Sequence, residues 1–265
     1  MRHAADLLDG KINPQTYERA STCEKHGAYT ERGGSLTGEL HRAMWFGCPQ
    51  CSREAREQQE LEERARQERV RQERIEARLN LSGIPLAFRD RTFDNFVAET
   101  DEQRYALDVA RSFADNFWTK HLPAGAFLVF GGNPGTGKSH LALAILQHVM
   151  RHSTGMYTDA MALIRRVRAT WRRDAQQSEE DVLHALGFTV DLLVIDEIGV
   201  QRGTDDEQAI VFEIINRRYR DLRPTILLTN LNGAGMKEFL GARTMDRLYE
   251  RGTTVPFLWE SHRRK

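Results

Sequence analysis

One stretch, residues 126–146, constrains the fold of this chain more than any other; it reads AFLVFGGNPGTGKSHLALAIL. An apolar run over residues 127–130 predicts a buried strand, and an Ala/Leu-rich segment over residues 140–149 predicts a helix. The glycine-rich turn between them matches the G-x-x-x-x-G-K-[ST] pattern of a phosphate-binding P-loop. The matching residues are Gly132, Gly137, Lys138 and Ser139. Strand, loop and helix in this order predict a nucleotide-binding α/β domain.

The P-loop spacing has a mechanical reason. Glycines let the backbone wrap around an anion, so that successive N–H groups point at phosphate oxygens. The following helix adds unpaired N–H donors and the positive end of its dipole. We expect Lys138 to reach the β- and γ-phosphates of ATP, and the Ser139 hydroxyl to ligate Mg²⁺.

A second buried strand, VDLLVIDE over residues 190–197, ends in two carboxylates. Ligands of parallel sheets bind beyond the carboxyl ends of the strands, so Asp196 is expected to hold Mg²⁺ through water. Glu197 is expected to orient and deprotonate the attacking water. The alternative is a capped strand end without chemistry. The expected nucleotide-binding residues are Gly132, Asn133, Pro134, Gly135, Thr136, Gly137, Lys138, Ser139, His140 and Asp196.

Further strands and helices alternate along the C-terminal part of the chain. A buried strand at 225–229 ends at Asn230, a polar residue placed to orient the hydrolytic water. Strands are also expected at 156–158 and 254–259, and helices at 102–121, 159–173, 206–222, 235–240 and 243–250. This alternation predicts an α/β fold with a parallel sheet covered on both sides, similar to an ASCE-type P-loop ATPase.

All three cysteines lie near the N-terminus, in Cys23-Glu-Lys-His26 and Cys48-Pro-Gln-Cys51. Two pairs with two-residue gaps suit one tetrahedral zinc ion, because one tight turn presents two ligands. The polar, Gly-rich segment between the pairs would hardly form an apolar core without a metal. His41 is a competing fourth ligand. The alternatives are three unrelated thiols beside a surface histidine, or a redox pair.

Residues 53–79 contain eight Glu and eight Arg and no Gly or Pro, which predicts a helix about 40 Å long. Opposite charges lie four apart at Glu60/Arg64, Glu62/Arg66, Arg64/Glu68 and Arg69/Glu73. The few apolar residues keep no heptad register, so a coiled coil is not expected. We interpret the segment as a solvated spacer, with a specific binding face as the alternative.

The helix expected at 159–173 ends in a basic cluster with one aromatic residue. Its members are Arg165, Arg166, Arg168, Trp171, Arg172 and Arg173. Arginines can follow a phosphate backbone, and an aromatic ring can stack on a base, so the cluster is a candidate for single-stranded DNA binding. The alternative is an ordinary exposed basic face.

Composition excludes several classes of protein. The chain has 265 residues with 38 basic and 38 acidic side chains, so no global basic field favours nucleic acid. No apolar run approaches the about 18 residues of a membrane span, and the start has no signal-peptide core. With three cysteines, we expect a reduced, cytoplasmic protein that makes no membrane contact.

Five segments carry a specific family resemblance: GGNPGTGKSHLALAI, DLLVIDEIGVQ, RPTILLTNLN, LGARTMDRL and FLWESHR. In this order they resemble the AAA+ domain of the bacterial replicative helicase loader (DnaC) family. LNLSGIPLAFRDRTFDNF also resembles the junction that precedes the ATPase in that family. The resemblance covers residues 79–263. The insertion-sequence helper ATPases (IstB family) share the fold and are the alternative.

The resemblance implies a loader that uses ATP and Mg²⁺, binds a hexameric replicative DNA helicase and single-stranded DNA, and self-associates through its AAA+ domain. Asn230 is then the sensor I residue. Arg247 resembles an arginine finger for the γ-phosphate of a neighbouring subunit, and Arg263 resembles the sensor II arginine. An arginine supplied in trans makes hydrolysis depend on assembly. The chain ends at Lys265, too soon for a helical lid, as in the loader family.

The front of the chain departs from that family, whose helicase-gripping region is not obviously zinc-bound. We therefore expect a zinc-binding helicase-docking unit at 1–52, a charged linker helix at 53–82 and an AAA+ ATPase domain at 83–265. Two other readings stay open: a transposition helper that binds double-stranded DNA, and a non-hydrolysing zinc adaptor. DEIGVQ and FLWESHR favour the loader, while Glu197 and Asn230 argue against the adaptor.

Overall fold

The computed structural model describes residues 15–35, 44–200 and 204–262. The chain divides into two compact units, Met1–Gln72 and Glu73–Lys265, and each is described by itself. In the described part of the chain, no helix combines the length and the apolar character that crossing a bilayer requires.

The N-terminal unit contains a small antiparallel sheet that the sequence analysis did not predict. Its strands are β1 (Gln15–Cys23), β2 (Gly27–Ser35) and β3 (Met44–Trp45), in the order β1-β2-β3. The sheet has a polar centre: the Arg19 guanidinium lies 2.6 Å from buried Glu31 and 4.0 Å from the centre of the Trp45 ring. The ion pair thus joins β1 to β2, and the cation–π contact joins β1 to β3.

The predicted charged helix is confirmed as α1 (Pro49–Leu81), and none of its residues is buried. Glu60 and Arg64 form the expected ion pair at 3.9 Å, whereas Arg66 pairs with Glu63 at 3.0 Å. Exposed pairs of this kind add only a few tenths of a kcal/mol each. The helix is therefore held by local propensity along most of its length.

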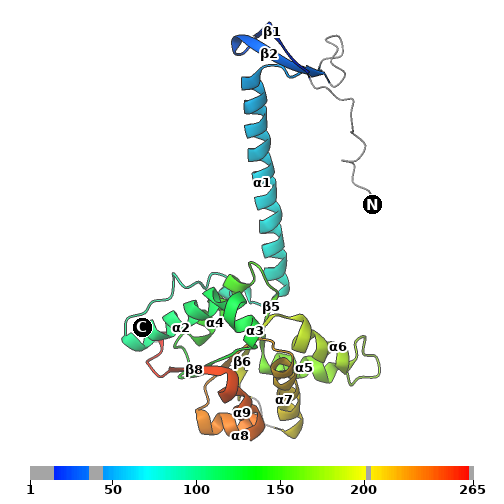
Figure 1. Cartoon of the computed structure of the whole chain (residues 1–265). Helices are drawn as coiled ribbons and strands as arrows, with labels where there is room; N and C mark the ends of the chain where they lie inside the picture. The colour runs from blue at the N-terminus through cyan, green and yellow to red at the C-terminus, as the bar shows by residue number, and fades with distance from the viewer. Residues whose placement is uncertain (1–14, 36–43, 201–203, 263–265) are drawn as a thin grey trace. The chain divides into compact units, whose positions relative to one another are not determined.

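The second unit is built on a five-stranded parallel sheet of order β5-β6-β7-β4-β8. Figure 1 labels β5, β6 and β8 of this sheet among the surrounding helices. The strands are β4 (Phe127–Gly132), β5 (Gly155–Asp159), β6 (Leu192–Ile198), β7 (Thr225–Thr229) and β8 (Gly252–Phe257). The predicted α/β fold is confirmed. β7 lies between the P-loop strand β4 and the carboxylate-bearing strand β6.

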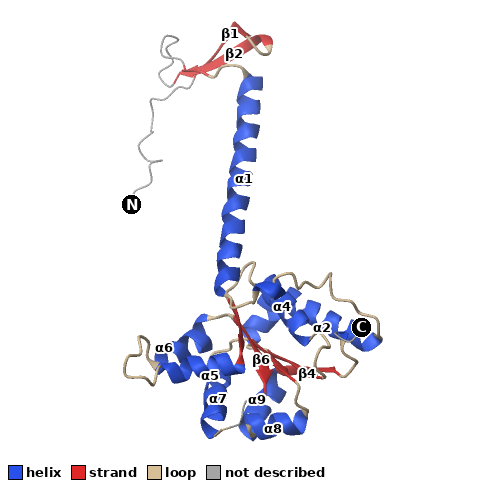
Figure 2. Cartoon of the chain, turned by 180° about the vertical axis from the view of Figure 1, so that it is seen from behind, coloured by secondary structure: helices blue, strands red, loops and turns tan. Residues whose placement is uncertain are grey.

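Helices cover both faces of this sheet (Figure 2). One face carries α2 (Asp101–Asp115) and α4 (Lys138–Val149); the other carries α5 (Ala160–Ala169), α6 (Glu179–His184), α7 (Asp205–Arg220), α8 (Gly233–Leu240) and α9 (Ala242–Arg251). Alternate residues of β4 serve the two layers: Leu128 packs towards α2 and α4, and Val129 towards the other helices. No helical lid follows β8 within the described residues.

Two predicted helices are shorter than expected. The helix predicted to reach residue 173 ends at Ala169, because the hydroxyl of Thr170 donates to the Val167 carbonyl at 2.6 Å and closes the last turn. The helix predicted to reach residue 121 breaks at Asn116 and continues as a π-helical turn (Phe117–His121). A short helix, α3 (Leu122–Ala124), follows this turn and precedes β4. The structure also adds α6 and a π-helical turn (Ala185–Thr189), which were not predicted.

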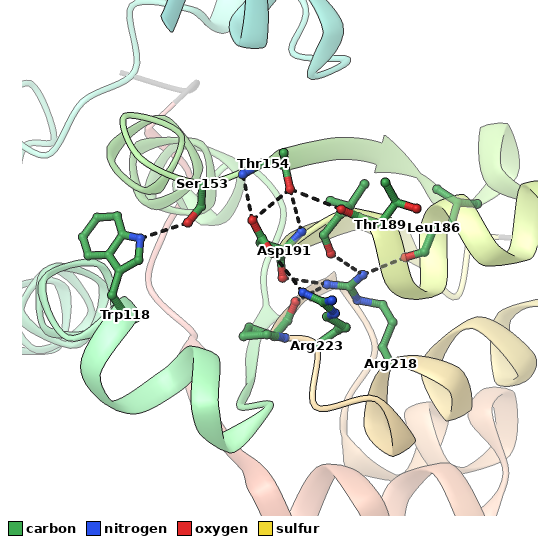
Figure 3. Close-up of polar contacts among 10 residues, drawn as sticks. Trp118, Ser153, Thr154, Leu186, Thr189, Asp191, Arg218 and Arg223 are labelled. Atoms are coloured by element: carbon green, nitrogen blue, oxygen red, sulfur yellow. Dashed lines mark hydrogen bonds and ion pairs between the residues drawn. The ribbon is translucent and has the colours of Figure 1, made fainter. Parts of the chain in front are cut away.

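A polar network around Asp191 and Arg218 joins the amino ends of the strands (Figure 3). The Asp191 carboxylate accepts from the backbone N–H and the hydroxyl of Thr154 and from Arg223 at 2.9–3.0 Å. Fully buried Arg218 donates to Thr225 Oγ1 at 2.8 Å. Its other acceptors are the carbonyls of Leu186, Val190, Asp191 and Pro224. The network anchors the amino ends of β6 and β7, which lie at the opposite end of the strands from the P-loop.

Candidate functional site

A cavity of about 430 Å³ opens at the carboxyl edge of the sheet. It is lined by Phe88, Arg91, Pro134, Gly135, Gly137, Lys138, Ser139, His140, Leu143, Tyr157, Asp196, Glu197 and Asn230. The P-loop and the carboxylate strand, far apart in the sequence, therefore share one cavity.

The P-loop turns into α4 at Lys138. Gly137 has a left-handed φ of +96°, and a β-carbon there would lie 2.7 Å from the Phe96 ring, so glycine is required. Buried Lys138 bends back over the loop and donates its ammonium to the carbonyls of Gly132 and Asn133, at 2.9 and 2.6 Å. These contacts hold the cation over the loop, where a triphosphate would replace the carbonyls as its partner.

The segment after β8 braces the P-loop from outside. Asn133 Nδ2 donates to the Leu258 carbonyl at 2.8 Å, and Trp259 Nε1 donates to the Thr136 carbonyl at 3.0 Å. A β-carbon at Gly132, whose φ is +139°, would lie 2.3 Å from the Phe257 carbonyl oxygen. The loop is thus held in shape by the chain itself, which lowers the ordering cost of binding an anion.

Asp196 accepts hydrogen bonds on both of its carboxylate oxygens. Its Oδ2 accepts from the Ser139 hydroxyl at 2.7 Å and from the Tyr157 hydroxyl at 2.9 Å, and its Oδ1 accepts from the Glu197 backbone N–H at 2.7 Å. The side chain is buried. Such contacts fix the carboxylate next to Ser139, the arrangement of ligands that Mg²⁺ prefers in P-loop sites.

Glu197 differs from its neighbour in exposure and backbone. It is exposed in the cavity and has a φ of +58°, which is rare for a residue with a side chain. The register between β6 and β7 shifts between Ile195 and Ile198, so both carboxylates sit in an irregularity of the strand. Such irregularities re-aim side chains next to functional sites.

Asn230 follows β7, and because β7 lies between β4 and β6, its side chain lines the cavity between the P-loop and the carboxylates. The strand order accounts for this meeting of three motifs. The carboxyl ends of adjacent parallel strands lie at one edge of a sheet.

Four lining residues were not predicted: Phe88, Arg91, Leu143 and Tyr157. Beside them, His140 Nε2 donates to the Thr92 carbonyl at 2.7 Å, and burial lowers the pKa of His140, so its ring is neutral at pH 7. Phe88 and Arg91 come from the segment before α2, which no motif marks as part of a nucleotide site. Only the way that segment packs brings them to the P-loop.

The two candidate arginines are not in this cavity. Arg247 lies on α9, with its guanidinium 5.5 Å from the centre of the Phe212 ring and 5.3 Å from that of Tyr219. It is absent from the lining of its own chain's cavity. Arg263 lies outside the described residues.

The predicted basic cluster is not one helix face. Arg165 and Arg166 are exposed on α5, and Arg168 pairs with Glu207 at 3.5 Å. The remaining members follow the end of the helix: Trp171 is 52% exposed and donates its Nε1 to Glu179 at 2.6 Å, and Arg172 pairs with Asp174 at 3.1 Å. Arg173 is exposed in the same turn. The exposed members present positive charge and one ring to solvent.

The N-terminal unit brings Cys23, His26, Cys48 and Cys51 together, with all four ligand atoms within 4.8 Å of one another. His26 Nδ1 lies 3.7, 3.6 and 3.3 Å from the three sulfurs, and the Cys23 and Cys51 sulfurs are 3.5 Å apart. Tetrahedral zinc sets edges of about 3.5–3.8 Å between such ligands. The cluster could therefore hold zinc. His41, the competing ligand, lies outside the described residues.

Two thiols of the cluster differ in how readily they ionise. Backbone N–H groups of His26 and Lys25 lower the pKa of Cys23 to about 6, so this thiol ionises readily. Hydrogen bonding to Cys23, together with burial, raises the pKa of Cys51 to about 11. His26 Nε2 lies 3.0 Å from Glu54 Oε1, the outer partner that orients a ligating imidazole.

The fold and the cavity together define a P-loop ATPase of the AAA+ type. The model of the family of IstB-like ATP-binding proteins matches residues 52–265. The replicative helicase loader DnaC of Escherichia coli (strain K12) is 37% identical over 190 residues, 71% of this chain and 76% of that protein. The chain therefore belongs to the DnaC family of IstB-like ATP-binding proteins.

Two further relatives and one solved structure also match this chain over most of the ATPase unit. The DnaC loader of Buchnera aphidicola subsp. Acyrthosiphon pisum is 36% identical over 187 residues, 70% of this chain and 74% of that protein. The uncharacterised protein YdaV of Escherichia coli (strain K12) is 40% identical over 191 residues, 71% of this chain and 74% of that protein. The crystal structure of the DnaC helicase loader aligns with a TM-score of 0.58 and 26% identity, covering 65% of this chain and 99% of that chain. The Cys/His cluster precedes the family match.

Proposed function

We propose that this chain is an ATP-dependent loader that binds a hexameric replicative DNA helicase and places it on single-stranded DNA. The observation that carries the proposal is the meeting of Lys138, Ser139 and Asp196 in one cavity of a chain whose relatives are named replicative helicase loaders. ATP acts as an assembly switch, because a bound γ-phosphate favours the associated state.

Different residues of the cavity have different roles in the proposed hydrolysis of ATP. Lys138 neutralises the β- and γ-phosphates, while the backbone N–H groups of the P-loop hold their oxygens. Glu197, the exposed carboxylate, accepts the proton of the attacking water, and Asn230 orients that water.

Mg²⁺ fits the same edge of the cavity. Ser139 Oγ and Asp196 Oδ2 are 2.7 Å apart and are both oxygen ligands of the kind that Mg²⁺ prefers, so these two residues would hold it. The ion would neutralise charge on the phosphates. Asp196 would hold its bound water in place rather than react.

Hydrolysis is proposed to require assembly of the ATPase domains side by side. Arg247 lies away from the cavity of its own chain, which supports a role at the nucleotide of a neighbouring subunit. Arg263 is proposed to contact the nucleotide as the sensor II residue. Turnover by the isolated chain should then be slow and should rise with assembly and DNA.

The N-terminal unit is proposed to bind zinc through Cys23, His26, Cys48 and Cys51 and to dock on the helicase. α1 then serves as the charged linker between docking unit and ATPase. The exposed members of the basic cluster, with Trp171 as the stacking ring, are proposed to follow single-stranded DNA.

Co-purification tests this proposal. The full chain should retain a hexameric replicative helicase in the presence of MgATP, and a Cys48→Ser variant should lose it while still binding ATP. Deposition of that helicase on circular single-stranded DNA should follow. Retention of a transposase on double-stranded DNA, with no retention of helicase, would contradict the loader. It would support the alternative function, an insertion-sequence helper ATPase of the IstB type.

A further inference from the structure

Tyr157 makes two contacts that connect different parts of the ATPase unit. Its hydroxyl donates to Asp196 Oδ2 at 2.9 Å inside the cavity. Its backbone N–H donates to the Ser82 carbonyl at 2.7 Å, just after the end of α1. Because β5 is an edge strand, its outer side is open to receive this segment.

The segment after α1 is closely fitted to Tyr157. Gly83 has a φ of +75°, and a β-carbon there would lie 2.4 Å from the Tyr157 carbonyl oxygen. Ser82 is fully buried, and its hydroxyl donates to the Leu79 carbonyl at 2.7 Å. Arg78 donates to the Met150 carbonyl at 3.0 Å, so the last turn of α1 is fastened to the body of the ATPase unit.

At its other end, Tyr157 shares an acceptor with the serine of the P-loop. Asp196 Oδ2 accepts from both Ser139 and Tyr157, so a change at that oxygen alters a hydrogen bond of Tyr157. Burial is the main cause that raises the pKa of Tyr157, and the neighbouring Asp196 adds to it. The phenol therefore stays protonated and keeps its donor role over the neutral range.

We propose that Tyr157 is a positioning residue that couples the magnesium–nucleotide state of the cavity to the last turn of α1. This inference rests on the proposed ATP-binding function. When ligands compete for Ser139 and Asp196, the phenol shifts with the carboxylate, and its strand carries the shift to Ser82 and Gly83. Coupling is reciprocal, so a partner acting on α1 would in turn alter the affinity for MgATP.

Hydrogen exchange on the full chain tests the coupling. Wild type should show altered amide exchange in peptides spanning residues 73–88 on addition of MgATP, and little change with ATP and a chelator. Tyr157→Phe removes one hydroxyl and keeps the ring, so the fold should persist. Its exchange response should be lost, and the Mg²⁺ concentration for half-maximal ATP binding should rise about three- to tenfold, the value of one hydrogen bond.

Tyr105→Phe, on the exposed face of α2, is the matched control and should behave as wild type. Gly83→Ala perturbs the other end of the connection and should also abolish the exchange response, while Lys138 and Asp196 still bind MgATP. A Tyr157→Phe variant with the full wild-type response would overturn the coupling. Wild type that binds MgATP without any exchange response overturns the coupling alone, whereas wild type that fails to bind MgATP overturns the proposed function as well.

Discussion

Asp196 and Glu197 are neighbours in the sequence but occupy different surroundings. Asp196 is buried and accepts hydrogen bonds from Ser139, Tyr157 and the Glu197 backbone, so its position is fixed. Glu197 is exposed in the cavity. Its own backbone is in the left-handed region, within an irregular part of the strand. The first carboxylate suits holding a cation, and the second suits accepting a proton from water.

This difference predicts the effect of Glu197→Gln. ATP binding should stay close to wild type, because the amide keeps the size of the side chain and Lys138 is untouched. The hydrolysis rate should fall by about 10²–10⁴, the usual contribution of a general base. Phosphate release measured at saturating ATP checks this. Glu238→Gln, exposed on α8, is the control, and equal turnover in both variants would contradict the role of Glu197.

Arg247 gives a second prediction at this scale. Arg247→Ala should bind ATP normally but lose assembly-dependent hydrolysis by about 10³-fold, the usual effect of removing an arginine finger. Arg243→Ala, exposed one turn earlier on α9, should retain turnover. The in-trans role can be separated by mixing Arg247→Ala with Lys138→Ala, since each variant supplies what the other lacks. Failure of the mixture to recover turnover would count against it.

At the scale of elements, the two ends of the sheet's strands have different roles: the amino ends are anchored, and the carboxyl ends carry the candidate site. Arg218 of α7 bonds the backbone around the starts of β6 and β7, and burial lowers its pKa to about 9, which leaves it a cation at pH 7. Asp196 lies near the carboxyl end of β6, and Asn230 follows the carboxyl end of β7. We infer that this polar network sets the register in which these side chains meet.

Arg218→Leu should therefore destabilise the ATPase unit by about 3–5 kcal/mol, since several buried acceptors lose their donor at once. Chemical denaturation followed by circular dichroism measures this loss. Arg220→Leu, exposed on the same helix, should change the stability by less than about 0.5 kcal/mol. A similar loss in both variants would show that the network has no special part in the sheet.

The strands and the P-loop could be predicted because their signals are local. Apolar runs, the glycine pattern and strand-end carboxylates each lie within a few residues, and β7 was predicted with its observed bounds. The end of α5 at Ala169 depends on one hydroxyl–carbonyl bond of Thr170, which periodicity does not register. Phe88 and Arg91 reach the cavity only through tertiary packing, so no pattern in the sequence marks them, whereas Tyr157 lies on a strand that was predicted without a role at the site.

At the scale of the whole molecule, two units with different means of stabilisation share one chain. The ATPase unit has an apolar core on each side of its sheet. The described part of the N-terminal unit contains a hairpin, a half-exposed ion pair and a Cys/His cluster, features typical of small units that depend on a metal. Sequence spacing predicted the four ligands, but the hairpin that presents them has too polar a pattern to be recognised as strands.

Metal removal should therefore affect the units unequally. We expect one zinc per wild-type chain and none in Cys48→Ser. A chelator or this substitution should abolish amide protection in β1 and β2, while MgATP affinity stays within about twofold. Elemental analysis and hydrogen exchange on the same samples check this. Retained protection of β1 and β2 without metal would contradict a structural role for zinc.

The central claim, that the cavity lined by Lys138, Ser139 and Asp196 binds the triphosphate of ATP, is tested most directly by calorimetric titration of the full chain with MgATP. Wild type and Lys237→Ala, which replaces an exposed lysine of α8, should bind one MgATP per chain. Lys138→Ala should lose about 10- to 150-fold in affinity, the value of charge-assisted hydrogen bonds to phosphate. Equal affinity in wild type and Lys138→Ala, or no binding by wild type, would contradict the account.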